Sequence, residues 1–521
     1  MYYELANYFF QIQEMIKYKK WRCLMDLEDL LKDLSYYSIY HLGRSKFDQV
    51  YLENLLLDEF NLSCPSNKEI NVKEIKELKT PDKFIDELKN IGISETKITK
   101  IFALLTPSPS QVIDTFNNYR KIDSTLALDY LYNLQIKNNY IKKSFLEKNI
   151  HWINKMKDNE IEITINLSKP EKNNSDIIKN LLKKEENKYP QCSLCIENMG
   201  YRGDDKIPPR QNLRILPLSL NNEEWFLQFS PYGYFQEHAI IINKVHKPMR
   251  ITKSTFFCLC DFVDQFDSYF IGSNCDLPIV GGSILSHEHY QGGKYTMPLM
   301  KAKDRYIFKT NNKIKVSYLD WFNSCVKVES KDKKILCEAL EKIKEAWYSY
   351  QNDQLDIIPF SNGQRHNGIT PIIRKENKTY IAYIILRNNY CNKEFPEGIF
   401  HAHKEYHNIK HEGIGLIEAM GYFILPGRLK NECEEIEKLL ENKEIDLPKY
   451  YLSHKEMKIH HNLINKLINN YGLGLKKEFT HQLLIDEINS TCVNILKNTA
   501  VFKNDEQGNK EAIKFIESIK L

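Results

Sequence analysis

The sequence is most informative at Gly281-Gly282-Ser283-Ile284-Leu285-Ser286-His287-Glu288-His289-Tyr290-Gln291-Gly292-Gly293. The run contains H-x-H-x-Q, in which His287, His289 and Gln291 are each two residues apart. Alternate side chains of a strand share a face, so the three would point the same way on a strand but could not converge on a helix. The glycine pairs argue against a helix interior and let the backbone approach a ligand closely. The run therefore predicts a strand whose aligned imidazoles suit attack on a phosphate.

Length and composition limit the classes of protein to which the chain can belong. Its 521 residues are too many for one ordinary core, so we expect two or three domains. The 73 Lys and Arg nearly balance the 69 Asp and Glu, and lysine-rich stretches are interpreted as solvated helix faces. No basic stripe interleaved with aromatics indicates nucleic-acid binding, and no apolar stretch approaches the ~18 residues that span a bilayer. The amino terminus does not have the pattern of a secretory signal, and the 12 cysteines are scattered. We expect a cytoplasmic protein that binds neither nucleic acid nor membrane.

The first part of the chain, to about Ile150, has helical periodicity and almost no strand-like alternation. At Glu160–Leu167 apolar and polar residues alternate, which predicts a half-buried strand. A polar helix is expected from Ser175 to about Lys188. The change in pattern predicts a helical amino-terminal region, residues 1–155.

Strands are expected to dominate after Cys192. Asn212–Leu220 and Glu223–Ser230 flank Asn221-Asn222, which predicts a hairpin, and Glu237–Asn243 predicts a short apolar strand. Thr255–Phe270 carries aromatics at helical spacing and is expected to pack on the sheet as a helix.

The order of elements then partly repeats. A helix at Lys331–Tyr350 precedes a hairpin over residues 369–387, a histidine-bearing segment and a strand at Ile414–Leu425. We expect an α+β fold of antiparallel sheets with packed helices, in two related halves, residues 156–328 and residues 329–521 with a helical tail.

Cys192-Ser193-Leu194-Cys195 is a C-x-x-C motif in a loop-like context. A thioredoxin-like role would need the motif at the start of a helix beside a strand, so that role is discounted. Paired thiolates supply two of the four ligands that zinc takes, and His246 and His287 are candidates for the others. The alternative is a pair of buried or incidental thiols.

His289 would remain available for reaction. A neutral imidazole is a competent nucleophile near pH 7 when its other N–H is held by an acceptor, and a neighbouring backbone carbonyl could serve. Gln291 could donate its amide N–H to a non-bridging phosphoryl oxygen as charge develops there. The alternative, that these are satisfied core or surface residues, fits the pattern less well.

A second group of histidines lies downstream. His401 and His403 would share a strand face, with His366 before them and His407 and His411 after them. A polar rim or a structural metal explains this group better than catalysis does.

Three charged residues follow this group: Lys410, Glu418 and Arg428. Any of them could hold sugar hydroxyls or a phosphate, although each taken singly is more often a surface charge. Gly282 and Ser283 are further candidates for substrate binding, and turns at the strand ends explain the glycines equally well.

His287-x-His289-x-Gln291 resembles the active-site strand of the galactose-1-phosphate uridylyltransferases, the transferase branch of the histidine-triad superfamily. Histidine-triad hydrolases normally carry histidine at the third position, so Gln291 favours a transferase. The flanking residues are similar to those of the second, mainly bacterial class. The motifs that carry the resemblance are Leu105–Ser110, Ile165–Lys172, Cys192–Asn198, Ser230-Pro231-Tyr232, Glu237-His238, Leu277–His287, Leu386–Asn389, Gly398–His401, Gly415–Gly421 and Leu425–Leu429.

The resemblance implies a histidine-triad-like fold and assigns roles to the candidate residues. His289 would be the nucleophile that becomes uridylylated, and Gln291 its phosphoryl-stabilising partner. Zinc would be held by Cys192, Cys195, His246 and His287. The residues that resemble three ligands of a second, structural metal are His366, His401 and His403; its carboxylate ligand has no counterpart here.

The substrates would be UDP-glucose and galactose 1-phosphate, exchanged through a covalent uridylyl-histidine with no organic cofactor, and the protein would be a homodimer. The candidates to bind them are Gly282, Ser283, Lys410, Glu418 and Arg428. Two other functions remain open: a histidine-triad-type nucleotide hydrolase or phosphorylase, and a non-catalytic nucleotide-sugar-binding protein. A zinc peptidase is not supported, because His287-Glu288 lacks the H-E-x-x-H spacing.

Overall fold

The computed structural model describes residues 26–167, 189–310 and 313–520. The chain forms two compact units, one of Met1–Ser144 with Lys188–Leu216 and the other of Phe145–Asn187 with Pro217–Leu521. The segment around the C-x-x-C motif thus belongs to the unit that contains the amino-terminal helices. The polar helix expected from Ser175 to Lys188 lies outside the described residues.

The first unit is helical, as the sequence predicts. Its helices are residues 26–41, α2 (Gln49–Phe60), α3 (Val72–Glu77), α4 (Asp82–Asn90), α5 (Glu95–Leu105), α6 (Pro109–Arg120) and α7 (Ser124–Lys137). Ser108 and Gln111 form a capping box at the start of α6, and Pro109 takes the first helical position, where no N–H is needed. The buried Arg214 donates from Nε to the Pro107 carbonyl at 2.8 Å, which joins the later segment of this unit to its helices.

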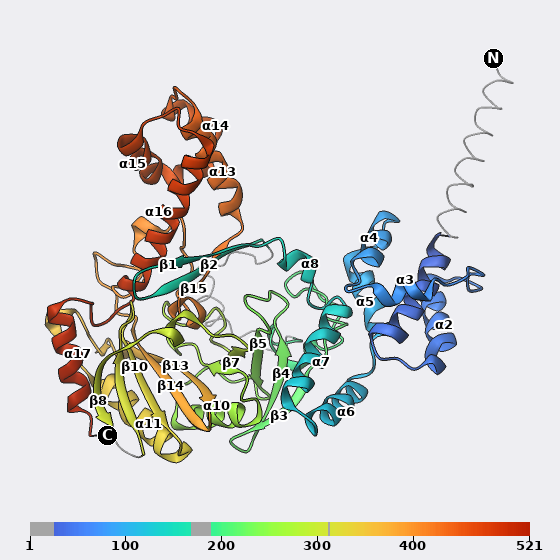
Figure 1. Cartoon of the computed structure of the whole chain (residues 1–521), viewed down its shortest axis with the longest axis horizontal. Helices are drawn as coiled ribbons and strands as arrows, with labels where there is room; N and C mark the ends of the chain where they lie inside the picture. Colours follow the sequence, from blue (N-terminus) through green and yellow to red (C-terminus); the bar gives the residue numbers. More distant parts are fainter. Residues whose placement is uncertain (1–25, 168–188, 311–312, 521) are drawn as a thin grey trace. The chain divides into compact units, whose positions relative to one another are not determined.

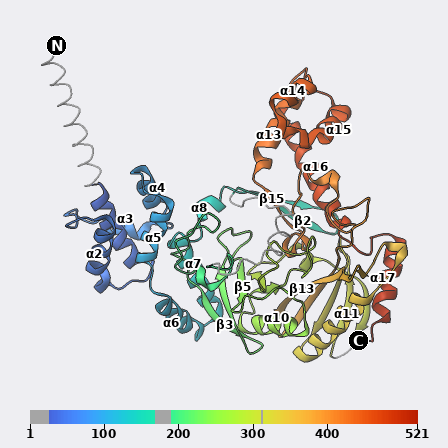
Figure 2. The ribbon, with the colours of Figure 1, turned by 180° about the vertical axis from the view of Figure 1, so that it is seen from behind.

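The second unit is built on a ten-stranded sheet with the order β3-β4-β5-β7-β6-β13-β14-β10-β9-β8, and its neighbours from β4 to β8 are antiparallel (Figures 1 and 2). The strands are β3 (Leu216–Leu220), β4 (Glu223–Phe229), β5 (Ala239–Asn243), β6 (Phe270–Gly272), β7 (His289–Gly293), β8 (Asp304–Thr310), β9 (Lys315–Leu319), β10 (Cys325–Ser330), β13 (Asn367–Glu376) and β14 (Thr379–Asn388). Helices α10 (Lys253–Gln265) and α11 (Lys333–Ser349) lie side by side against this sheet (Figure 1). The expected α+β fold is confirmed.

The sheet joins two runs of adjacent strands, β3 to β7 and β8 to β14, where β6 pairs with β13. The expected boundary at residue 328 falls inside β10, which pairs with β14 along its whole length. In the sheet, the two runs divide between β7 and β8, because β8, β9 and β10 complete the sheet on the far side of β14.

Both expected hairpins are present, and each turns on two residues with positive φ. Asn221 and Asn222 have φ of 47° and 62° between β3 and β4, while Asn377 and Lys378 have 45° and 68° between β13 and β14. Two successive residues in the left-handed region give the turn whose twist matches that of the strands, and asparagine tolerates it well.

A smaller sheet contains β1 (Ile150–Lys155), β2 (Glu160–Asn166) and β15 (Tyr422–Pro426), with β2 and β15 parallel. The strand expected at Ile414–Leu425 is wrong over its first half, where one helical turn, α12 (Leu416–Ala419), precedes β15. Gly421, with φ of 90°, ends this turn and donates to the Glu418 carbonyl at 2.8 Å. A run of apolar residues this short does not distinguish a buried helical turn from a strand.

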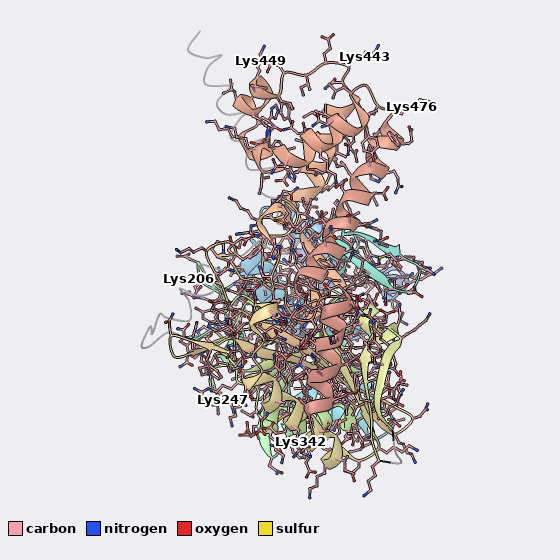
Figure 3. The ribbon with its side chains drawn as sticks, turned by 90° about the vertical axis from the view of Figure 1, so that its left-hand side faces the viewer. Lys206, Lys247, Lys342, Lys443, Lys449 and Lys476 are labelled. Carbon is pink, nitrogen blue, oxygen red and sulfur yellow. The ribbon has the colours of Figure 1, made fainter. Side chains whose placement is uncertain are left out.

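A short helix, α8 (Lys143–Leu146), precedes β1, and the helices after β15 are α13 (Arg428–Glu441), α14 (Leu447–Ser453), α15 (His461–Tyr471), α16 (Lys477–Asn498) and α17 (Glu506–Ser518). A hydrophobic cluster of their own joins α13 to α16. Figure 3 shows Lys443, Lys449 and Lys476 at the outer end of this helical group, and all three are exposed, as solvated lysines should be. In the described part of the chain, no helix has both the length and the apolar character needed to cross a membrane.

Candidate active site

Strand β7 carries the histidine-glutamine motif in the interior of the sheet. It pairs with β5, where Ile242 is opposite His289, and with β6, where Gly272 is opposite Gln291. His289 and Gln291 are two residues apart on a strand and share a face, while Tyr290 between them stacks on Trp225 with ring centroids 4.6 Å apart. The expected strand therefore holds His289 and Gln291, whereas His287 lies outside it, two residues before its first residue.

His289 has the tautomer that nucleophilic attack requires. Its Nδ1 lies 2.8 Å from the backbone carbonyl oxygen of His287, so Nδ1–H donates and Nε2 keeps its lone pair. Burial, with a smaller contribution from the nearby imidazole of His287, lowers the pKa of His289 to about 4, although the contact with the His287 carbonyl opposes the shift. The ring is neutral near pH 7, which is the reactive form.

A cavity of the second unit opens beside Gln291. Its lining includes Gln291, Gly282, Ser283 and Glu418, together with Tyr234, Asn274 and Glu412. Three of the candidates for substrate binding, Gly282, Ser283 and Glu418, are thus brought to the side chain proposed to contact phosphate. Sequence reasoning missed Tyr234, Asn274 and Glu412, because only the fold brings these three residues to the cavity beside Gln291.

Lys410 lies under this cavity as a buried cation. Its Nζ donates to Glu412 Oε2 at 2.9 Å, to Glu418 Oε1 at 3.2 Å and to the carbonyl of Ile424 at 2.9 Å. Its side chain is 1% exposed, so the ammonium serves to orient the two carboxylates. Carboxylate oxygens held in this way are acceptors for the hydroxyls of a sugar.

The glycine-bounded loop before β7 packs tightly against its neighbours. A Cβ on Gly281 would lie 2.4 Å from the carbonyl oxygens of Cys275 and Leu277, and one on Gly282 would lie 2.7 Å from Asn274 Nδ2. Asn274 also accepts through Oδ1 from the backbone N–H of Leu416 at 2.8 Å. It thus joins this loop to the segment around Leu416 and Glu418, which forms one wall of the cavity.

Arg428, the remaining candidate for substrate binding, begins α13 and has other partners. It donates to the Asn408 carbonyl at 3.1 Å and to Glu432 at 2.6 Å. The structure thus gives Arg428 a role in tying α13 to the preceding loop.

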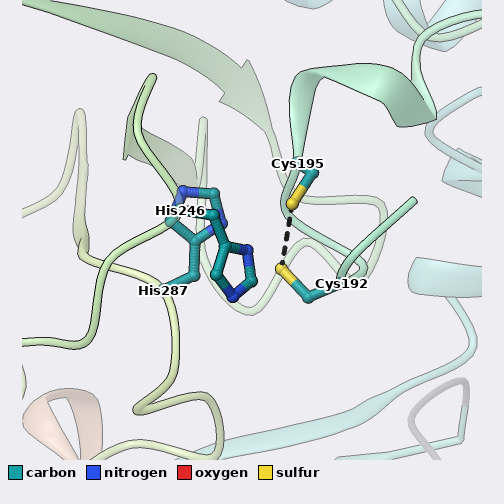
Figure 4. A group of neighbouring side chains, drawn as sticks. All are labelled: Cys192, Cys195, His246 and His287. Atoms are coloured by element: carbon teal, nitrogen blue, oxygen red, sulfur yellow. Dashed lines mark hydrogen bonds between the residues drawn. The ribbon is translucent and has the colours of Figure 1, made fainter. Parts of the chain in front are cut away.

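The four zinc candidates are brought together (Figure 4). One ligand atom from each of Cys192, Cys195, His246 and His287 lies within 4.8 Å of the others. Two thiolates and two imidazoles are a donor set that suits tetrahedral zinc. His287 Nε2 lies 2.8 Å from the Asn243 carbonyl oxygen, and donation of Nε2–H there leaves Nδ1 to act as the ligand. The residues present therefore fit a metal ion.

The three histidines considered for a second metal are not gathered in the same way. His366 contacts Ser361 Oγ at 2.6 Å and Asn389 Oδ1 at 2.8 Å, and His403 Nε2 lies 2.9 Å from the Ile399 carbonyl. His401 is fully buried, and burial lowers its pKa to about 3. Among the described residues, the other set of ligand atoms within 4.8 Å of one another comes from Glu397, His407 and His411. The structure gives no support to a metal held by His366, His401 and His403.

A neutral histidine with a free Nε2 lone pair, an amide two residues later on the same strand and a cavity bounded by carboxylates suit a protein that transfers nucleotidyl groups. Comparison with known proteins identifies the family. Residues 93–248 match the N-terminal domain of galactose-1-phosphate uridyl transferase, and residues 262–458 match its C-terminal domain. The chain belongs to the galactose-1-phosphate uridyl transferase family.

Similar proteins cover most of the chain. It is 39% identical over 493 residues to the galactose-1-phosphate uridylyltransferase of Caldanaerobacter subterraneus subsp. tengcongensis, an alignment that spans 91% of this chain and 94% of that protein. It is 41% identical over 436 residues to the enzyme of the same name from Fusobacterium nucleatum, spanning 82% of this chain and 85% of that protein. Among solved structures, yeast Ap4A phosphorylase Apa2 is similar at 14% identity and a TM-score of 0.28, covering 57% of this chain and 89% of that one.

Proposed function

We propose that this protein is a UDP-glucose–hexose-1-phosphate uridylyltransferase that exchanges the uridylyl group between UDP-glucose and galactose 1-phosphate through His289. The observation that carries the proposal is the 2.8 Å contact of His289 Nδ1 with the His287 carbonyl, which leaves Nε2 as the nucleophile. Membership of the uridyl transferase family and the position of Gln291 on the same strand support it.

In the first half-reaction, the Nε2 lone pair of His289 attacks the α-phosphorus of UDP-glucose. The bond from that phosphorus to the bridging oxygen breaks, and glucose 1-phosphate leaves with the electron pair. This leaving group is a phosphate monoester whose second pKa is about 6, so it needs no general acid near pH 7. The imidazole becomes more positive as the N–P bond forms, and the His287 carbonyl that accepts from Nδ1–H stabilises that charge.

In the second half-reaction, a phosphate oxygen of galactose 1-phosphate attacks the same phosphorus and the N–P bond breaks. UDP-galactose forms and His289 regains its lone pair. The attacking and leaving groups are chemically alike, so one site serves both directions with ping-pong kinetics. Gln291 would donate its amide N–H to a non-bridging oxygen in both steps, where added charge develops.

The wall that holds Lys410, Glu412 and Glu418 would bind the hexose. Its carboxylates accept hydroxyl protons, and the buried ammonium fixes their orientation. The Gly281-Gly282 backbone packs so closely against the carbonyl oxygens of Cys275 and Leu277 and against Asn274 that no side chain fits at either position.

Zinc would be held by Cys192, Cys195, His246 and His287, where it would supply structural cross-linking. His287 contributes its carbonyl to His289 as well as its ring to this group, so fixing His287 also fixes the nucleophile. We further propose a cytoplasmic homodimer, which the resemblance implies; light scattering on the purified full chain measures the oligomer.

The test is incubation of the full chain with UDP-glucose alone. The expected result is release of one glucose 1-phosphate per active site and a uridylyl adduct on His289, which galactose 1-phosphate then discharges. His289→Ala should abolish both steps, while His481→Ala, at an exposed histidine, should leave them unchanged. Continuous turnover with water would instead identify a hydrolase, and absence of any release would refute the enzymatic proposal.

A further inference from the structure

His238 lies immediately before β5, and its imidazole contacts the side chain of Gln291. Its Nε2 is 3.0 Å from Gln291 Oε1. Neighbouring segments hold the backbone on both sides of this contact. Ser230 N–H donates to the His238 carbonyl at 2.8 Å, and Ile240 is opposite Gln291 where β5 pairs with β7. Gln291 therefore lies on a strand in the interior of the sheet, and His238 lies at the residue before the neighbouring strand β5.

The His238 ring is buried and held by aromatic neighbours. It is 2% exposed, with its centroid 5.1 Å from the ring of Tyr234 and 4.7 Å from the ring of Phe235. Burial lowers the pKa of His238 to about 4, although the contact with Gln291 opposes this shift. The imidazole is consequently neutral near pH 7 and carries one N–H.

The position of that proton follows from the surroundings of the ring. Nδ1 is buried without a hydrogen-bond partner among the described residues. An unpaired buried N–H is rarer and more costly than an unpaired acceptor, so the proton is placed on Nε2. Nε2–H then donates to Gln291, which requires that the amide oxygen, and not the amide nitrogen, faces His238.

This contact distinguishes the amide oxygen of Gln291 from its amide nitrogen, which are alike in shape. If the amide rotated by half a turn, its oxygen would face the cavity and repel a phosphoryl oxygen instead of donating to it. With Oε1 engaged by His238, the NH₂ group is turned away from His238, and Gln291 lines the cavity. We propose that His238 is a positioning residue. It holds the Gln291 amide so that the amide N–H groups point toward the phosphoryl group that is being transferred. The inference rests on the proposed uridylyl transfer.

The test compares His238→Phe, which keeps an aromatic ring but removes the donor, with wild type and with His481→Phe as a surface control. The first measurement is the single-turnover rate of His289 uridylylation at saturating UDP-glucose, alongside the dissociation constant of UDP-glucose. Loss of one well-placed oxyanion donor lowers a rate by about 10²–10³. Because the amide of His238→Phe retains part of its correct orientation, we expect a rate about 10–100 times lower, with UDP-glucose affinity within about threefold of wild type.

Two further readouts separate positioning from a structural effect. In a Gln291→Ala background, adding His238→Phe should cause almost no further loss, since the residue that it orients is gone. His238→Gln, which restores a donor, should recover part of the rate. The two diastereomers of UDP-glucose that carry sulfur at the α-phosphorus should also react at more similar rates in His238→Phe than in wild type.

An equal loss in the Gln291→Ala background, or weakened UDP-glucose binding with an unchanged rate, would overturn the inference. If His238→Phe does not fold, the wild-type chain still tests it by ¹⁵N NMR of labelled histidine: protonation at Nε2 of His238 supports the inference and protonation at Nδ1 refutes it. Failure of the wild-type chain to form any adduct would refute the proposed function itself, which is a different outcome from an active wild type with an insensitive His238.

Discussion

Replacement of Lys410 by methionine should destabilise the second unit strongly. Lys410 is 1% exposed and neutralises Glu412 and Glu418, whose side chains are 11% and 9% exposed. Methionine keeps the length and apolar stem of the side chain but removes the ammonium that both nearly buried carboxylates contact. Removing one partner from a buried ion pair costs about 3–5 kcal/mol, so the free energy of unfolding should fall by about that amount.

The assay is urea-induced unfolding at pH 7, followed by tryptophan fluorescence, on Lys410→Met and on Lys443→Met as an exposed control. The control should lie within about 0.5 kcal/mol of wild type. Adding Glu412→Gln to Lys410→Met should restore part of the lost stability, because one of the two carboxylate charges that Lys410 contacted is removed. A loss below about 1 kcal/mol in Lys410→Met, with no recovery in the double variant, would refute the reasoning that these charges are desolvated.

Further outcomes are expected elsewhere in the chain. Zinc analysis by mass spectrometry should give one ion per wild-type chain and a loss of it in Cys195→Ser, because three ligands hold zinc more weakly than four. Gly292→Ala should lower the free energy of unfolding by about 3 kcal/mol or more, since the new Cβ would lie 2.2 Å from the backbone oxygen of Phe270; thermal melting measures it. Burial opposes the ionisation of Glu432, but its partners, led by a hydrogen bond from His460, outweigh it and lower its pKa below 4.5. Its stabilising effect is therefore complete above that pH and is lost on acidification, so the stability difference between wild type and Glu432→Gln should shrink from pH 6 to pH 3 in urea titrations.

Elements whose residues are adjacent in the sequence, such as hairpins, were predicted correctly from the sequence pattern. The hairpin at Asn221-Asn222 was predicted because the turn residues themselves tolerate positive φ. The residues before β15 were misassigned because the sequence gives Gly421 no marker of the left-handed conformation that ends a helical turn. The pairing of β10 with β14 was not predicted, because it is a contact between distant segments of the chain.

The candidate site shows the same limit. The two-residue spacing of His289 and Gln291 was enough to place them on one strand face, and the carbonyl acceptor for His289 comes from the same short motif. Asn274 and Glu412 could not be predicted in this way, because they meet Gln291 only through the fold of the second unit. His238 was visible as part of a family motif, but its partner became known only from the register of β5 with β7.

The division of the cavity between distant parts of the chain has a consequence for synthesis on the ribosome. Strand β7, which contains His289, is synthesised long before the segment that contains Glu412 and Glu418. It is also synthesised before β13, the strand that pairs with β6. Domains fold during translation as their residues become available. A nascent chain in which β7 has just emerged thus carries the proposed nucleophile without the opposite wall of the cavity, and the proposed hexose site is complete only after the second run of strands.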